Sequence, residues 1–95
     1  MLDLDFEWDV EKDRENFETA TQVFYDYFRM ERHDDDSGED EDRWQTMGFF
    51  NNVLFVVYTE RGDTIRIISA RVAEPFERRI YYGHSKKGDW QRVNP

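Results

Sequence analysis

A group of arginine and tyrosine side chains in the second half of the chain is the part of the sequence best suited to chemistry. Its members are Arg66, Arg71, Arg78, Arg79, Tyr81 and Tyr82. Arginine presents a rigid, permanently charged fork that matches phosphate geometry, and tyrosine stacks on bases or donates a hydrogen bond. Such groups stabilise charge that develops on a scissile phosphate without a metal ion. The group therefore favours a phosphate-containing ligand such as RNA.

A purely structural role for two of these arginines is equally open. Arg78 and Arg79 lie near the expected end of a helix, where positive charge is favourable. Glu74 and Glu77 lie in the same segment, so ion pairs with these carboxylates would use the same charges. Residue type alone does not separate this reading from RNA binding.

Strand geometry argues against a simple site made from Arg66 and Arg71. The two residues are five positions apart on one expected strand, and side chains alternate between faces along a strand. On a regular strand they therefore point to opposite faces. They can converge only at the strand end or after a bend.

Other catalytic patterns are not found in the sequence. There is no glycine-rich phosphate loop and no Ser-His-Asp set, and Ser69 has no adjacent base. His33 and His84 have no partner at metal-ligand spacing, so we expect both at the surface without a chemical role. The spaced carboxylates of residues 34–42 do not follow the twelve-residue calcium pattern. We expect no metal and no cofactor.

Composition describes one small domain. The chain has 95 residues, no cysteine, 38% hydrophobic residues and a net charge of −9. Residues 1–42 carry 4 Lys and Arg against 17 Asp and Glu, whereas residues 43–95 carry 9 against 5. A basic second half can still face an anionic ligand. No apolar run approaches the roughly 18 residues of a membrane span, so we expect a soluble cytoplasmic protein with no membrane contact.

The first half predicts a strand and a helix. Residues 4–8 alternate apolar and acidic side chains, which is typical of a short strand with one buried face. Asp9 is a plausible N-cap, and apolar residues recur at helical spacing up to Phe28 with no Gly or Pro between. We expect one long helix from Asp9 to Phe28, followed by an exposed acidic loop at residues 34–42.

The second half predicts a three-stranded antiparallel meander and a short helix. The strands are expected at residues 43–50, 53–60 and 64–71, with tight turns at Asn51-Asn52 and Gly62-Asp63. The continuous apolar run at residues 53–57 predicts a central strand covered on both faces. Pro75 and Gly83 bracket the short helix. The fold class is therefore α+β, with one domain at residues 1–83 and a polar tail at residues 84–95.

The chain resembles the BrnT-like toxins of bacterial type II toxin-antitoxin systems, whose fold is similar to that of RelE-type ribonucleases. The matching stretches are residues 6–9 (Phe-Glu-Trp-Asp) with Lys12 and Asn16, residues 17–24, 41–48 and 56–62, residues 65–71 (Ile-Arg-Ile-Ile-Ser-Ala-Arg), and residues 77–79 (Glu-Arg-Arg) with Tyr81. Together they cover about residues 6–82.

This resemblance implies a metal-independent endoribonuclease that cuts RNA and inhibits translation. It implies that Lys12, Arg66, Arg71 and Tyr81 stabilise and orient the phosphate. Arg78 and Arg79 would then hold the RNA backbone. The implied partners are the RNA substrate and a DNA-binding, BrnA-like antitoxin.

One departure from the family pattern has two consequences. In the family about seven residues, including a Lys-His-Gly turn, follow the Asn, but here Asn16 runs directly into Phe17. Histidine is a natural general acid or base at neutral pH, so its loss predicts a weakened or inactive enzyme. The alternative function is an inactive module that only binds the antitoxin. Loss of the turn also predicts that two helices fuse, which would carry the N-terminal strand onto a second copy in a domain-swapped homodimer.

Overall fold

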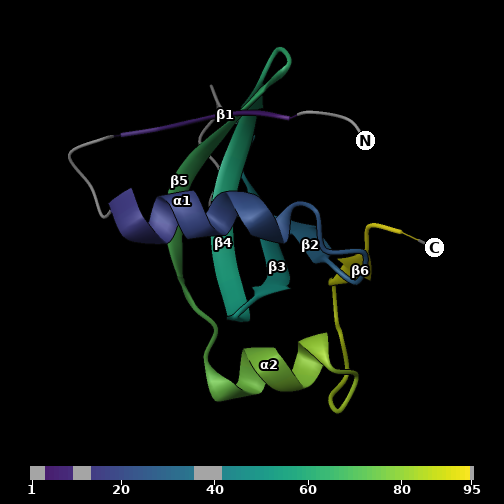
Figure 1. Ribbon diagram of the computed structural model, residues 1–95. Coiled ribbons are helices and arrows are strands. Elements are labelled where there is room, and N and C mark those ends of the chain that lie inside the picture. The colour runs from purple at the N-terminus through teal and green to yellow at the C-terminus, as the bar shows by residue number, and fades with distance from the viewer. Residues whose placement is uncertain (1–3, 10–13, 36–41, 95) are drawn as a thin grey trace.

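A computed structural model of the chain describes residues 4–9, 14–35 and 42–94. These residues form one mixed β-sheet with two helices (Figure 1). The strand order is β1-β5-β4-β3-β2-β6. The strands are β1 (Asp5–Trp8), β2 (Met30–His33), β3 (Trp44–Phe50), β4 (Asn52–Arg61), β5 (Thr64–Val72) and β6 (Gln91–Arg92), and the helices are α1 (Arg14–Val23) and α2 (Pro75–Tyr81). The α+β class is confirmed. No helix in the described stretches is long and apolar enough to cross a membrane.

The antiparallel meander of β3, β4 and β5 is confirmed. Asn51 adopts a φ of 62° and Gly62 a φ of 59°, which are the left-handed conformations that tight hairpin turns require. Residues 53–56 of the central strand β4 are all buried, because β3 and β5 flank it and both faces are covered. The expected short helix is also present as α2, with Pro75 at its first turn and Gly83 at a φ of 78° after its end.

The expectation of one long helix from Asp9 to Phe28 is wrong. Helix α1 ends at Val23, and two turns lead from it into β2. The Asp26 carboxylate explains the break, because its Oδ1 accepts the Phe28 backbone N–H at 2.9 Å and so offers the backbone an alternative to helix. Phe28, expected on the buried helix face, is 61% exposed.

The early end of α1 also removes the basis for a domain swap, which was the expected fused helix. Strand β1 pairs in parallel with β5 of its own chain, with Phe6 opposite Ile65 and Trp8 opposite Ile67. A ten-residue helix α1 then returns the chain across the sheet to β2. No fused helix carries β1 away, so the described part of the chain completes its own sheet.

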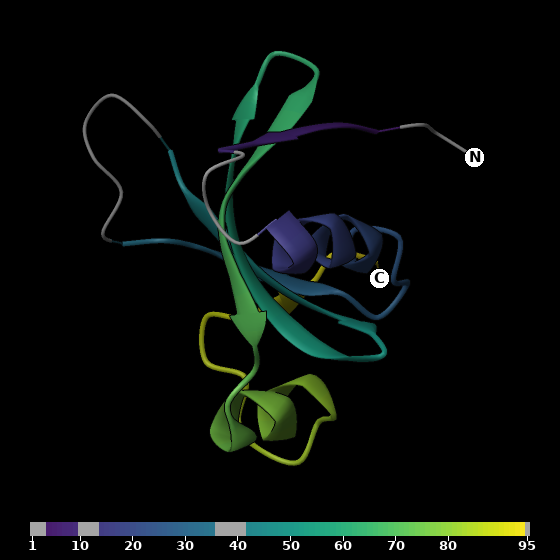
Figure 2. The ribbon, with the colours of Figure 1, turned by 60° about the vertical axis from the view of Figure 1, so that its left-hand side comes forward.

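Two apolar clusters lie on opposite faces of the sheet. Helix α1 covers one face with Phe17, Ala20 and Val23, and it packs so closely that a Cβ on Gly48 of β3 would lie 2.7 Å from the Val23 Cβ. The second cluster lies where α2 meets the sheet and includes Tyr81. Figure 2 shows the sheet nearly edge-on, with α1 against one face and α2 at one end. The rest of the face opposite α1 carries no helix among the described residues.

Strands β2 and β6 were not expected from the sequence, and β6 changes the view of the C-terminal segment. Residues 84–95 were expected as a polar tail, but Trp90 is only 2% exposed and its ring lies 6.0 Å from the Phe55 ring. The segment then pairs with β2, with Arg92 opposite Met30, and the Arg92 Nη2 donates to the Tyr81 carbonyl at 2.5 Å. One buried tryptophan and an arginine fork therefore hold this segment against the domain.

Candidate nucleic-acid interface

A β-bulge decides where the arginines of β5 point. Val57 lies opposite Ser69, and the next residue, Tyr58, lies opposite Ile67, so Ile68 is an extra residue without a partner. An extra residue in one strand shifts the alternation of side chains by one position. Two side chains on either side of Ile68 that would point to opposite faces of a regular strand therefore point to the same face here.

The bulge places Arg66, Ser69 and Arg71 on one face of the sheet. Arg66 pairs with Thr59 and Arg71 with Phe55. Phe55 belongs to the cluster on the face opposite α1, and cross-strand partners share a face. The expectation that Arg66 and Arg71 point to opposite faces is therefore wrong, because the strand carries a bulge between them.

Arg71 is held in a fixed orientation by Glu77 of α2. Its Nη1 and Nη2 donate to the two carboxylate oxygens at 2.7 and 2.9 Å, and its guanidinium lies 4.3 Å from the centre of the Phe55 ring. Glu77 is buried, and it also accepts the Glu74 backbone N–H at 2.7 Å. The expected ion pairs of Glu77 with Arg78 or Arg79 are not seen, because this carboxylate already faces Arg71.

The electrostatics of this pair show that both groups are charged. Hydrogen bonding to Glu77 raises the pKa of Arg71. Burial alone would raise the pKa of Glu77, but the hydrogen bonds from Arg71 and from the Glu74 N–H outweigh burial and hold this pKa below its usual value. The Arg71 side chain remains 47% exposed. A guanidinium has five N–H donors, so the oriented fork keeps donors for a ligand.

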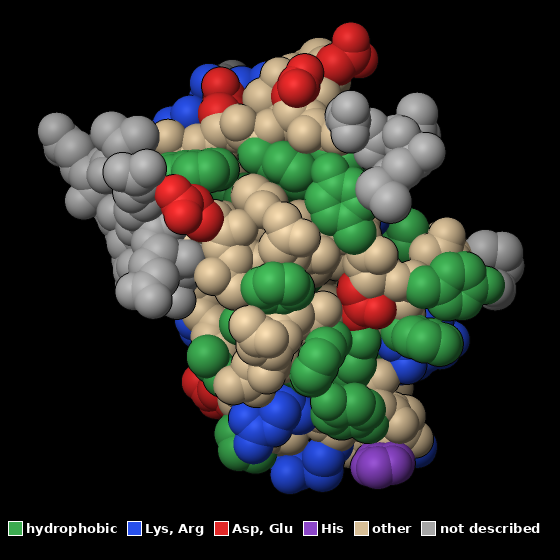
Figure 3. Space-filling model, in the orientation of Figure 1, with side chains coloured by type: hydrophobic (Ala, Val, Ile, Leu, Met, Phe, Trp, Pro, Cys, Tyr) green, Lys and Arg blue, Asp and Glu red, His purple; other side chains and the backbone are tan. Residues whose placement is uncertain are grey.

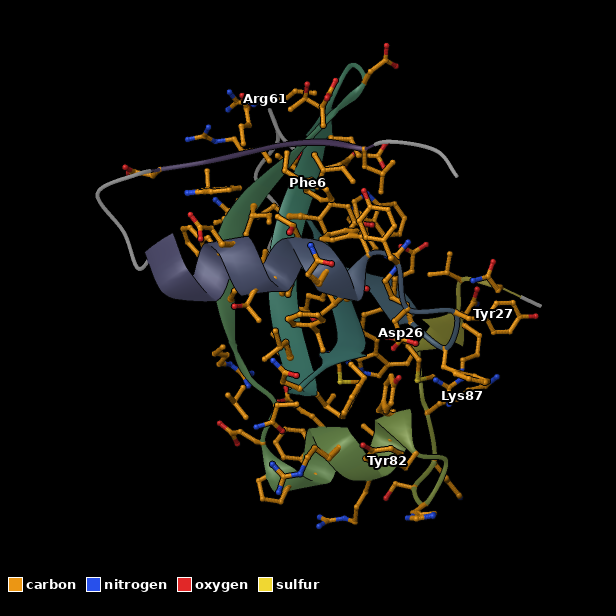
Figure 4. All side chains as sticks on the ribbon, in the orientation of Figure 1. Phe6, Asp26, Tyr27, Arg61, Tyr82 and Lys87 are labelled. Atoms are coloured by element: carbon orange, nitrogen blue, oxygen red, sulfur yellow. The ribbon has the colours of Figure 1, made fainter. Side chains whose placement is uncertain are left out.

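Arg66 lies on the same face but at the other end of β5. Its Nη1 is 3.5 Å from a Glu7 oxygen of β1, and Arg61 is 3.7 Å from the same oxygen. Figure 4 marks this end of the sheet by Arg61 and the α2 end by Tyr82. Arg66 and Arg71 are thus separated by roughly 15 Å of strand, which suits two different phosphates of one extended strand. Exposed ion pairs such as Arg66–Glu7 are weak, so a phosphate can replace the carboxylate.

A further arginine on this face was missed by the sequence analysis. Arg32 of β2 donates through Nε to the Gln45 side chain at 2.7 Å, and its guanidinium lies 4.6 Å from the centre of the Trp90 ring. Its two Nη groups carry four more N–H donors. Residues 30–33 form a strand of only four positions, so alternation was too short to reveal it.

A hollow of about 200 Å³ lies beside Arg32. Its lining residues are Arg32, His33, Asp34, Asp35, Gln45 and Asp89. His33 is 3.4 Å from Asp42 and stacks edge-on against Trp44, so it does not join the arginines. No group of three or more His, Asp or Glu side chains in the described ranges is arranged to hold a metal ion.

The remaining predicted site residues do not gather with Arg66 and Arg71. Tyr81 is buried in the second cluster, and its hydroxyl donates to Asp26. Burial and then this hydrogen bond raise the pKa of Tyr81 above the usual tyrosine value. Arg78 donates to the Ala73 carbonyl at 3.0 Å, whereas Arg79 is exposed. Lys12 lies outside the described residues.

We name the basic sheet face by its five members: Arg32, Gln45, Arg66, Ser69 and Arg71. All are exposed or partly exposed, and they come from β2, β3 and β5 on the side opposite α1. Arg32, Gln45 and Ser69 lie in one row across the sheet, and Arg66 and Arg71 lie on either side of this row along β5, so the face offers N–H and O–H donors in both directions. Such a surface can bind several phosphates of a nucleic acid and can stabilise negative charge on them.

A comparison with models of known protein families identifies the family of this chain. A family model described as "Ribonuclease toxin, BrnT, of type II toxin-antitoxin system" matches residues 8–77, which is well over half of the chain. The chain belongs to the BrnT family. The matched range runs from the end of β1 to the Glu77 carboxylate and includes all five members of the basic sheet face. A type II system implies an antitoxin as the partner of this BrnT-family chain. No curated protein matches it.

Proposed function

We propose that this chain is a metal-independent endoribonuclease toxin that binds RNA on the basic sheet face, cleaves it and so inhibits translation. The observation that carries the proposal is the bulge at Ile68, which brings Arg66, Ser69 and Arg71 onto one open face. A regular strand would have pointed Arg71 into the core under α1. The bulge therefore supports a surface selected for an anionic ligand.

The roles follow from the hydrogen bonds within the site. Arg71 is the best-oriented group, because Glu77 fixes its fork while half of the side chain stays exposed. In the proposal Arg71 stabilises charge at the scissile phosphate, and Arg66 binds a neighbouring phosphate by displacing Glu7. Lys12 keeps its proposed role in phosphate stabilisation.

Tyr81 contributes as a positioning residue. Its hydroxyl proton is already donated to Asp26, so the group is poorly suited to proton transfer. The contact instead ties α2, and with it Glu77, to the loop after α1. The proposed roles of Arg78 and Arg79 are limited to binding the RNA backbone beyond Arg71.

The decisive experiment is an RNA-cleavage assay on the purified chain, with and without a chelator. The proposal expects cleavage that the chelator leaves unchanged and that Arg71→Ala reduces by about a hundredfold, the loss typical of one charge-stabilising donor. Lys86→Ala is the matched control, because it removes one positive charge from an exposed site outside the face. Cleavage lost with the chelator would contradict the metal-free mechanism.

The second candidate function is an inactive module that only binds the antitoxin. Two observations favour it: the Lys-His-Gly turn is missing after Asn16, and Arg71 and Tyr81 are both hydrogen-bonded to carboxylates of their own chain. The test is a variant with this turn inserted between Asn16 and Phe17. Cleavage by the insertion variant alone, with equal antitoxin binding by both chains, would favour the module. Light scattering on the same samples measures whether either chain is a homodimer.

A further inference from the structure

Five aromatic side chains form an exposed patch away from the basic sheet face. We name the aromatic patch by its members: Tyr27, Phe28, Phe49, Phe50 and Tyr82. Their exposed fractions are 61%, 61%, 48%, 38% and 52%. They come from three separate segments, namely the loop between α1 and β2, the end of β3 and the residue after α2. Exposed aromatics gathered in this way typically mark an interaction surface.

The Asp26 carboxylate draws the three segments together. Its Oδ1 accepts the Phe28 N–H at 2.9 Å, and its Oδ2 accepts the Phe49 N–H at 2.8 Å and the Tyr81 hydroxyl. The Tyr27 and Phe28 rings lie 5.3 Å apart. Figure 4 labels Asp26 together with Tyr27 and Tyr82 of the patch. Hydrogen bonds to Asp26 therefore fix the three segments that carry the patch.

A basic rim borders the aromatic patch. Residues 83–92 contain three Lys and Arg against one Asp in a chain whose net charge is −9. Arg92 donates to the Phe28 carbonyl, and the His84 ring lies 6.5 Å from the Tyr82 ring. Lys87 lies on the patch side of α2 in Figure 4, and Figure 3 shows Lys, Arg and His side chains along the lower border of the hydrophobic groups. The charge beside the patch is thus opposite to that of the whole molecule.

We propose that the aromatic patch is the docking surface for an acidic segment of the antitoxin with apolar anchors. The proposal rests on the chain's membership of a toxin-antitoxin family for its partner, and on the patch alone for the place. Apolar side chains of the segment bury the exposed rings of Tyr27, Phe28 and Tyr82, and its carboxylates pair with the rim. A second copy of this chain fits less well, because two copies would bring two basic rims together.

RNA is disfavoured as the occupant of this patch. The Asp26 carboxylate lies among its members and accepts hydrogen bonds from three donors. The Asp26 carboxylate repels phosphates. It does not repel apolar side chains that lie over the rings, or acidic side chains that pair with the rim. RNA and antitoxin thus have separate surfaces in this molecule, the basic sheet face and the aromatic patch.

The test measures antitoxin affinity and RNA binding on the same variants by calorimetry. Tyr27→Ala and Lys87→Glu in the full chain are expected to weaken antitoxin binding by about tenfold or more, as for residues at the centre of an interface. Phe76→Ala is the matched control, because Phe76 is 52% exposed on α2 but outside the patch. RNA binding is expected to stay unchanged in all three. Lys87→Glu replaces an exposed side chain, so it keeps the test valid where Tyr27→Ala folds poorly.

Four outcomes overturn the proposal. Antitoxin affinity within about twofold of the unmodified chain for both patch variants overturns it, as does no binding of the antitoxin by the unmodified chain. A loss of RNA binding with antitoxin binding intact would assign the patch to RNA. A fall in solution mass with antitoxin binding intact would assign it to self-association. If the unmodified chain binds the antitoxin but leaves RNA uncut, the proposed nuclease function is refuted. The docking proposal is still supported in that case if the patch variants lose affinity for the antitoxin.

Discussion

The ion pair between Arg71 and Glu77 can be tested by replacing Glu77 with glutamine. The buried carboxylate accepts two hydrogen bonds from Arg71 and one from the Glu74 backbone N–H. Glutamine has nearly the same shape, but it retains one acceptor oxygen and carries no charge. Glu77→Gln therefore removes at least one charge-assisted bond and leaves the Arg71 fork without its counter-charge, while α2 keeps its side-chain volume.

The expected cost is about 2 kcal/mol of unfolding free energy. A hydrogen bond to a charged group contributes about 1.5–3 kcal/mol net. The lower part of this range applies, because the Arg71 side chain is 47% exposed and solvent screens the pair. For a domain of this size the loss corresponds to a fall in melting temperature of about 10 °C. Glu60→Gln is the matched control at an exposed position, with an expected change below about 0.5 kcal/mol.

Denaturant unfolding at several pH values measures the effect and its sign. The pKa of Glu77 is lowered in the folded chain, so its contribution is complete above the usual value of 4.5 and is lost as the pH falls through the folded pKa. The difference between the unmodified chain and Glu77→Gln is thus constant from neutral pH down to about pH 5 and shrinks in stronger acid. A double-mutant cycle with Arg71→Gln isolates the coupling, expected at about 1 kcal/mol.

Two results would refute this reasoning. Equal stability of Glu77→Gln and the unmodified chain at neutral pH would mean that the pair contributes nothing to folding. A difference that grows in acid would mean that the pKa of Glu77 is raised rather than lowered, so that burial outweighs Arg71. In either case Arg71 is not oriented by Glu77, and its proposed role at the phosphate loses its structural support.

Three further predictions concern packing and charge. Gly48→Ala is expected to cost about 2 kcal/mol or more in denaturant unfolding, because its Cβ would lie 2.7 Å from the Val23 Cβ; Gly62→Asn, at a φ of 59° with no atom within 4 Å of its Cβ, is the control, and equal costs would contradict the packing argument. Trp90→Ala is expected to cost about 3 kcal/mol and to raise amide exchange in β2, whereas Val93→Ala, at 37% exposed, has little effect; unchanged exchange would mean that the C-terminal segment is not part of the fold. Arg66→Ala is expected to lower the slope of log RNA affinity against log salt by about 0.7, the contribution of one phosphate of a single strand, and an unchanged slope in titrations would place RNA elsewhere.

Much of the second half was predictable because its signals are local. The apolar run at residues 53–57 and the turn residues Asn51 and Gly62 each predict structure within a few positions, and Asn51 and Gly62 both adopt the positive φ of tight turns. The resemblance to BrnT-like toxins could also be recognised from the sequence, because it rests on short runs of residues. The family match over residues 8–77 confirms it.

The errors came from features that depend on distant contacts. Helix α1 ends early because Asp26 bonds to Phe28, Phe49 and Tyr81, and two of these partners come from other elements. The bulge at Ile68 is set by pairing with β4, so the facing of Arg71 was read wrongly from alternation. Strands of four and two residues, such as β2 and β6, are too short for a periodic signal. Arg32 was missed for this reason.

The most direct test of RNA binding on the basic sheet face is an NMR titration that follows the arginine Nε–H signals. A short RNA with 2′-O-methyl groups keeps the ligand uncut, because the attacking hydroxyl is blocked. We expect the signals of Arg32, Arg66 and Arg71 to shift with RNA. The signal of Arg29, which bonds Thr46 at 3.1 Å and lies over Phe24 on the α1 face, should stay unchanged. Shifts at Arg29 with none at the other three would place RNA on the wrong face and contradict the proposal.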